Sequence, residues 1–128
     1  MASYKELIVW QKAVDLVIET YKLCRILPKE ETYGLSDQMR RAAVSIPSNI
    51  AEGQARKNKK EFIHFLYIAK GSLAELLTQL EICIRLGYIS RDQAAAAEGS
   101  SEEIGRMITN LIKNLQQPMG NQKSVTDN

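Results

Sequence analysis

The sequence is poor in the residues from which catalytic and metal sites are usually built. It contains one histidine, His64, and two cysteines in 128 residues. It also lacks a glycine-rich phosphate loop, a histidine and cysteine cluster at zinc spacing and a serine nucleophile elbow. A lone histidine beside apolar helix positions is usually structural. We therefore expect a protein that is not an enzyme and that holds no cofactor and no metal.

Glycine, proline and long apolar runs are also scarce. With 7 Gly, 3 Pro, 45% hydrophobic and 25% charged residues, the composition is that of an ordered helical protein, and 128 residues suffice for one domain. No apolar run approaches the roughly 18 residues of a membrane span. The opening segment MASYKELIVWQKAVD is too charged for a signal peptide, so we expect a cytoplasmic protein without membrane contact.

The two cysteines, Cys24 and Cys83, fall in apolar stretches. A thiol in such surroundings usually behaves as a small core side chain. A disulfide between the two is the disfavoured alternative.

Apolar residues recur every three or four positions in four separate stretches, which is the spacing of one face of an α-helix. Short connections between four helices favour an up-down-up-down antiparallel four-helix bundle, so the predicted fold class is all-α. The bundle should span residues 1–117, and the polar segment 118–128 should be a disordered tail. The core-facing positions expected in the four helices are Leu7, Trp10, Val14, Val17, Tyr21 and Cys24; Leu35, Met39, Ala42, Ala43, Ile46 and Ile50; Phe62, Phe65, Leu66, Ala69, Leu73, Leu76, Leu80 and Cys83; and Ala94, Ala97, Ile104, Ile108, Leu111 and Leu115.

Several residues are typical of helix ends. The second helix should begin near Leu35 and end at a C-terminal cap near Gly53. Asn58 and Ser90, each followed three residues later by Glu or Gln, resemble the capping boxes that begin a helix.

Pro47 lies inside the predicted second helix. A proline there removes one backbone donor and pushes against the carbonyl of Ala43, at about 3 kcal/mol in a regular helix. We therefore predict a bend in which Ser48, Asn49 or Gln38 satisfies that carbonyl.

Gly71 and Gly99 are two of the glycines inside the later helices. Gly71 and Ser72 together predict close packing against Ala42 or Ala43, because glycine is otherwise unfavourable in a helix interior. Gly99 predicts a kink or fraying in the fourth helix.

Charge is unevenly distributed, although the net charge is only +2. Residues 35–60 carry six positive side chains against Asp37 and Glu52, so this third of the chain holds the whole positive surplus. The run ARKNKK, residues 55–60, precedes the third helix, near the positive end of that helix's dipole. The candidate nucleic-acid ligands are Arg40, Arg41, Arg56, Lys57, Lys59 and Lys60.

These cations have two interpretations. They could neutralise several phosphates and give salt-dependent, sequence-tolerant binding of nucleic acid, or they could form a solvated surface loop. Aromatic residues do not interleave with the basic run, so recognition of the backbone or shape of folded RNA fits better than stacking on single strands.

One flank of the second helix carries a polar stripe. Its members are either solvated or form a polar seam between helices or subunits that fixes their register. The stripe consists of Gln38, Arg41, Ser45, Asn49 and Glu52.

The other flank is small and largely apolar, and Arg40 lies at its border. Val44, Pro47 and Ala51 are the predicted subunit contacts on this flank. The apolar face of the first helix is wider than one neighbouring helix would cover, which also favours a homo-oligomer. Arg40 and Arg41 therefore have a structural interpretation besides phosphate binding.

Three segments together resemble the four-helix-bundle family of 23S rRNA intervening-sequence proteins. They are VWQKAVDLVIETYKL at 9–23, YGLSDQMRRAAVSIPSNIAEG at 33–53 and EFIHFLYIAKGSLAELLTQLEICIRLGYI at 61–89. The resemblance implies a bacterial protein encoded within, or related to those encoded within, insertions in large-subunit rRNA genes, without established catalysis.

The related accessory variability determinant of diversity-generating retroelements is a pentameric barrel whose basic surface binds nucleic acid and a reverse transcriptase. By that resemblance, a homopentamer is the first expectation for the oligomer. The leading hypothesis is thus an oligomeric bundle that binds rRNA or other nucleic acid. The alternative is a module that contacts a partner protein, such as a nucleic-acid enzyme, without binding nucleic acid itself.

Overall fold

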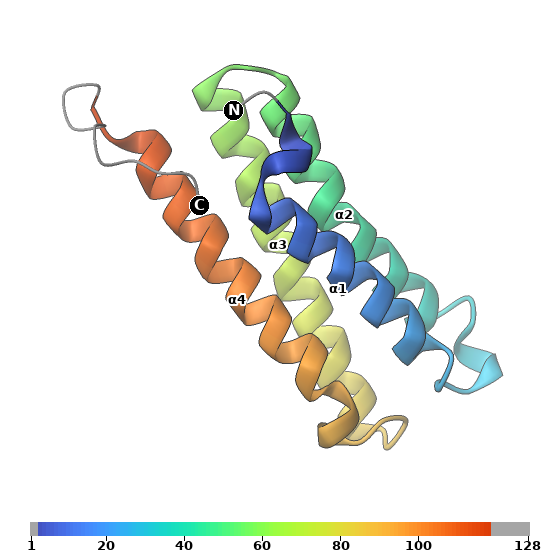
Figure 1. Cartoon of the computed structure of the whole chain (residues 1–128). Coiled ribbons are helices and arrows are strands. Elements are labelled where there is room, and N and C mark those ends of the chain that lie inside the picture. Colours follow the sequence, from blue (N-terminus) through green and yellow to red (C-terminus); the bar gives the residue numbers. More distant parts are fainter. Residues whose placement is uncertain (1–2, 119–128) are drawn as a thin grey trace.

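Four long helices form an antiparallel bundle in the computed structural model, which describes residues 3–118 (Figure 1). This part of the chain contains no strand, so the predicted all-α four-helix bundle is confirmed. Apart from Pro118, the expected tail 118–128 lies outside the described residues. The helices are α1 (Ile8–Cys24), α2 (Leu35–Ala55), α3 (Lys59–Arg85) and α4 (Arg91–Gln116).

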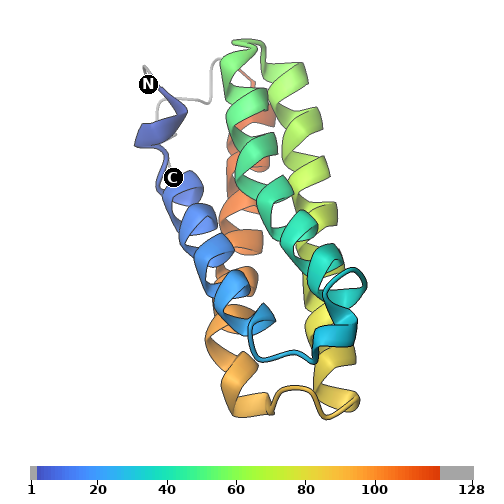
Figure 2. The ribbon, with the colours of Figure 1, turned by 90° about the vertical axis from the view of Figure 1, so that its right-hand side faces the viewer.

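Each helix packs against its neighbours in the sequence, and α4 closes the ring against α1 (Figure 2). Two short 3-10 helices, η1 (Tyr4–Glu6) and η2 (Lys29–Glu31), precede α1 and α2, and both contact α2. The α2–α3 connection therefore lies at the same end of the bundle as the start of α1. The α1–α2 and α3–α4 connections lie together at the opposite end (Figure 1).

The core is a continuous cluster of aliphatic side chains from all four helices. In α1 the predicted stripe is displaced, because Ala13, Leu16 and Leu23 are buried whereas Val17 is half-buried and Tyr21 is exposed. A second apolar stripe, formed by Ala13, Leu16, Leu23 and Leu27, runs beside the predicted one and faces the centre of the bundle. The predicted stripe lies at the edge of the core, where Trp10 and Val17 are partly buried.

The expected C-terminal cap at Gly53 is wrong. Helix α2 continues to Ala55, and Gly53 is buried inside it. A Cβ atom at this position would lie 2.7 Å from Cβ of Phe65 and 3.1 Å from Cδ1 of Phe62. Helix α2 therefore approaches α3 closely at Gly53, and a side chain there would push the helices apart.

The prediction for Gly71 is also wrong, because a Cβ atom there would meet nothing within 4 Å. The close contact comes from the next residue, Ser72, whose hydroxyl lies 2.8 Å from that of Ser45. Helix α4 shows no break at Gly99. It begins with the predicted capping box, since Ser90 and Gln93 exchange both hydrogen bonds.

Helix α2 also runs through Pro47 without interruption, and Pro47 is buried. The Asn49 amide does not serve the Ala43 carbonyl as expected. It donates instead to the backbone carbonyl of Ser45 at 2.7 Å and to its hydroxyl at 2.9 Å.

Both cysteines are buried and unpaired. Burial raises the pKa of the Cys83 thiol to about 11, and burial also raises that of Cys24. The thiols accordingly act as core side chains, and the disfavoured disulfide does not form.

Candidate nucleic-acid interface

The α2–α3 connection is a tight turn built from cations. Helix α2 ends at Ala55, and the chain leaves it through Lys57, which has a left-handed backbone with φ of 54°. Asn58 then caps α3 as predicted, because its side-chain oxygen accepts a hydrogen bond of 3.0 Å from the Glu61 amide. Residues 56–60, named here the basic connection, are all exposed.

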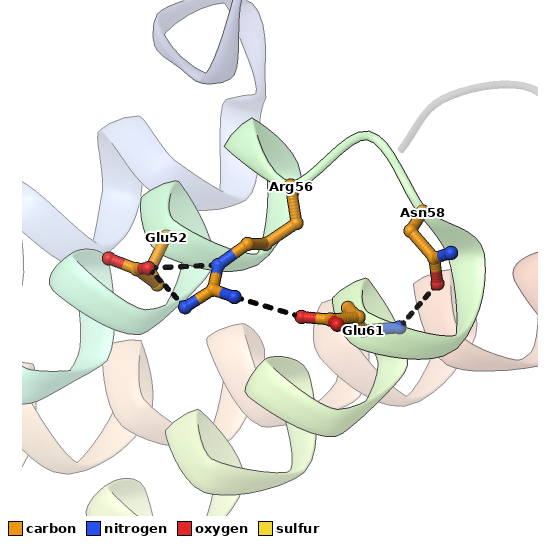
Figure 3. A network of polar contacts seen from close by, with 4 residues as sticks. All are labelled: Glu52, Arg56, Asn58 and Glu61. Atoms are coloured by element: carbon orange, nitrogen blue, oxygen red, sulfur yellow. Dashed lines mark hydrogen bonds and ion pairs between the residues drawn. The ribbon is translucent and has the colours of Figure 1, made fainter.

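Arg56 holds the two sides of the basic connection together (Figure 3). Its guanidinium donates to Glu52 Oε2 at 2.8 and 3.0 Å and to Glu61 Oε1 at 3.1 Å. The hydrogen bonds to Glu52 raise the pKa of Arg56 further above its usual range. The same group lies 5.1 Å from the centre of the Phe65 ring. Arg56 is thus a clamp between α2 and α3, and its charge is already opposed by two carboxylates.

The three lysines of the basic connection are in a different situation. Within residues 3–118, no ion pair or ring contact involves the side chains of Lys57, Lys59 or Lys60. Lys59 and Lys60 are the first residues of α3, where the helix dipole disfavours cations and attracts anions. This arrangement leaves a cluster of positive charge that the chain itself does not neutralise.

Arg40 and Arg41 lie far from the basic connection. They are about 15 residues before it on the same helix, which corresponds to about 22 Å along α2. The Arg40 guanidinium donates to the Thr32 carbonyl at 3.1 Å and lies 5.9 Å from the centre of the Tyr21 ring. Arg41 pairs with Asp37 one turn earlier at 2.9 Å. The six candidate ligands therefore form two separate groups, one near each end of the bundle.

The polar stripe of α2 also divides. Ser45 and Asn49 bond to one another, and Ser45 joins Ser72 of α3, so these residues form a seam between two helices of one chain. Arg41 and Glu52 instead pair with exposed charges, while Gln38 is exposed at the rim of a shallow hollow.

The sequence predicts close packing at Ser72 against Ala42 or Ala43, but its hydroxyl contacts Ser45 instead. Ser72 lies three residues after Ala69 and four before Leu76, both of which are buried. A residue at this spacing belongs to the inward face of α3.

The predicted subunit contacts differ in exposure. Val44 is 41% exposed, Ala51 is half-buried and Pro47 is buried within the chain. Val44 lines a hollow together with Tyr21 of α1, and Ile18, one turn before Tyr21, is 54% exposed. This hollow is formed by α1 and α2 jointly, and Asp37, Arg40 and Arg41 line it beside the two apolar side chains.

His64 lies beside the basic connection, on the exposed side of α3. Its ring stands edge-on to Phe65, with the ring centres 5.3 Å apart. It lines an open hollow of about 570 Å³ together with Lys60 and Arg56. In residues 3–118 no group of three His, Cys, Asp or Glu side chains could hold a metal ion. Across the same range, no helix is long and apolar enough to cross a membrane.

Fold and site together define a small all-α bundle with a basic connection at one end. The chain belongs to the 23S rRNA-intervening sequence protein family, whose model matches residues 5–110. A solved structure from Bacteroides thetaiotaomicron VPI-5482, a protein of unknown function from the S23 ribosomal protein family, is similar with a TM-score of 0.77 and 30% sequence identity. That match covers 83% of this chain and 99% of the other. No curated protein matches the chain. The family description names no enzymatic activity.

Proposed function

We propose that this protein binds structured RNA in the cytoplasm, without catalysis, and that the lysines of the basic connection hold the phosphates. The observation that carries the proposal is the contrast within one short turn. Arg56 is neutralised by Glu52 and Glu61, whereas Lys57, Lys59 and Lys60 have no ion pair in the described part of the chain. The family's description links its members to 23S rRNA, which makes RNA the first ligand to test.

The positions of these lysines also favour ligand binding over a role in stabilising the fold. A non-glycine residue in the left-handed region, such as Lys57, costs about 1 kcal/mol. Cations in the first turn of a helix, such as Lys59 and Lys60, oppose its dipole. The carbonyl end of α2 offsets part of this effect, because it favours cations at the same turn. Folding alone therefore gives little reason for three lysines here, whereas an anionic ligand does.

A salt series with a labelled rRNA stem-loop tests the proposal. The affinity is measured for the wild type and for a variant with Lys57, Lys59 and Lys60 changed to Ala. We expect the slope of log affinity against log salt to fall by about one for each lysine removed. Arg56 is left in place, so that the connection keeps its clamp.

A matched variant has Lys22, Arg25 and Lys29 changed to Ala, which removes the same charge from the opposite end of the bundle. This control should keep the wild-type slope. Absence of binding at low salt, or equal losses in the two variants, would contradict the proposal.

A second candidate function is favoured by a group of exposed apolar side chains on α1 and α2, namely Ile18, Tyr21 and Val44. We propose that copies of the chain associate through it, with the pentamer implied by the family resemblance as the first expectation. Sedimentation of the wild type should give an oligomer, and Ile18→Asp with Val44→Asp should give a folded monomer. A wild-type monomer would leave this surface as the docking site for a partner protein, the remaining alternative.

A further inference from the structure

An aromatic ring stands in solvent close to the basic connection. Tyr67 of α3 is 53% exposed, whereas Tyr4 and Trp10 at the same end are partly buried against the core. Tyr67 follows Lys60 by seven residues, which is close to two full turns of helix. The two side chains therefore project from the same face of α3.

This face of α3 carries two aromatic rings, His64 and Tyr67, between two lysines. His64 lies between Lys60 and Tyr67, and the Lys70 ammonium lies 5.9 Å from the centre of the Tyr67 ring. A ring has two faces, and a cation over one of them leaves the other for a flat partner. Lys70 also lines a shallow hollow with Arg106 of α4, which adds a second cation, and with Glu102.

The part of α3 that follows the basic connection carries no negatively charged side chain over thirteen residues. Residues 62–74 of α3 contain no carboxylate. Glu61, at the start of the stretch, is bound to Arg56. A polyanion that contacts the lysines can therefore continue along this face without meeting an unpaired acidic side chain of α3.

The distances suit a short length of nucleic-acid strand. Lys60 and Tyr67 are separated by about 10 Å along the helix axis, at 1.5 Å per residue. About three stacked nucleotides, at 3.4 Å each, span that length. A strand whose phosphates lie at the basic connection can thus bring one of its bases to Tyr67.

We propose that Tyr67, flanked by Lys70, stacks on an unpaired base of the bound RNA. This inference rests on the proposed RNA binding and narrows the ligand to a stem that adjoins a loop or a single-stranded end. A continuous duplex keeps its bases paired and stacked, and so offers none to the ring, whereas unpaired bases stack readily on exposed aromatic side chains. It also changes the expectation of pure backbone recognition, because α3 brings to the basic connection an aromatic residue that is absent from the basic run.

The test compares two RNA probes that share one stem, a hairpin with an open loop and a blunt duplex without one. Tyr67→Ala should weaken hairpin binding about 10-fold and leave duplex binding unchanged, since one stacked base contributes about 1–3 kcal/mol. Tyr67→Phe should retain hairpin affinity because it keeps the ring. Tyr33→Ala is the control, since Tyr33 is 94% exposed but lies at the opposite end of the bundle.

A second readout separates stacking from a general effect on the surface. The hairpin carries 2-aminopurine at one loop position after another, and its fluorescence should fall at one of them on binding to the wild type but not to Tyr67→Ala. Equal losses for hairpin and duplex, or an unchanged fluorescence at every position, would overturn the stacking proposal even if the lysine variant loses affinity. If the wild type binds neither probe at low salt, the proposed RNA binding itself fails.

Discussion

The two ends of the bundle use different residues for the turn that follows a helix. After α2 and again after α3, the chain turns at a residue with a left-handed backbone conformation. This residue is Lys57, with φ of 54°, after α2 and Gly87, with φ of 81°, after α3. Glycine adopts this conformation without steric cost, whereas lysine does not. The α3–α4 end is therefore built for stability, and the α2–α3 end keeps a charge at the expense of stability.

The two ends of the bundle also differ in their ion pairs. At the α3–α4 end, Glu81 accepts from both Arg85 at 2.9 Å and Arg91 at 3.1 Å. The hydroxyl of Tyr88 there donates to Glu31 at 2.9 Å. At the α2–α3 end, Glu52 and Glu61 both pair with Arg56 (Figure 3). The difference shows that the availability of a cation depends on its neighbours in space more than on the number of cations in a segment.

The largest expected effect on stability comes from Gly53, which packs closely against α3 near the α2–α3 connection. Gly53→Ala should lower the free energy of unfolding by about 2 kcal/mol, because its Cβ would overlap Cβ of Phe65. That contact cannot relax by rotating a flexible side chain, so it outweighs the gain of up to about 1 kcal/mol that alanine brings to a helix. Urea unfolding followed by circular dichroism measures the change.

Gly71→Ala is the matched control, since it makes the same substitution inside a helix at a position with open space around it. It should raise the free energy of unfolding by up to about 1 kcal/mol. A loss of stability at Gly71, or a gain at Gly53, would show that the α2–α3 contact is not as tight as described.

An exchange of the two left-handed residues should give effects of about 1 kcal/mol in opposite directions. Lys57→Gly should stabilise the protein, and Gly87→Lys should destabilise it, because only glycine avoids the steric cost at positive φ. Lys57→Gly should also lower the salt slope for RNA binding by about one. If Lys57→Gly destabilises the protein, the lysine contributes to the fold, and the contrast between the ends disappears.

The helices were predictable because their apolar spacing and caps are local signals. The stripe of α3 and the caps at Asn58 and Ser90 required no knowledge of the partners. The predictions that were wrong concerned residues whose role depends on the packing between helices. The spacing of Gly53 and Gly71 does not reveal which glycine faces another helix, and in α1 two adjacent stripes compete for the core.

The candidate site was predictable as a segment but not as a surface. The basic run was evident, whereas the pairing of Arg56 with residues four before and five after it depends on the geometry of the turn. Tyr67 was missed because it lies outside the run by sequence and joins it only through the helical repeat. The separation of Arg41 from the run follows from the length of α2 and could have been computed from the rise per residue.

The smallest expected effect concerns acid stability at the α3–α4 end. Hydrogen bonds from Arg91, then Arg85, lower the pKa of Glu81 from 4.5 to about 2. A carboxyl group with a depressed pKa stabilises the folded state above its unfolded pKa, and the contribution is lost as pH falls through the folded value. Glu81→Gln should therefore lower the melting temperature slightly at pH 7, and the gap to the wild type should close between about pH 4.5 and pH 2.

Glu75→Gln supplies the control on the same helix, since Glu75 is exposed and has no ion pair in residues 3–118. At pH 7 its melting temperature should equal that of the wild type. High salt should shrink the Glu81 gap at pH 7, because exposed ion pairs are screened. A gap that persists below pH 2 would mean that Glu81 stabilises the protein through packing and not through its ion pairs with Arg85 and Arg91.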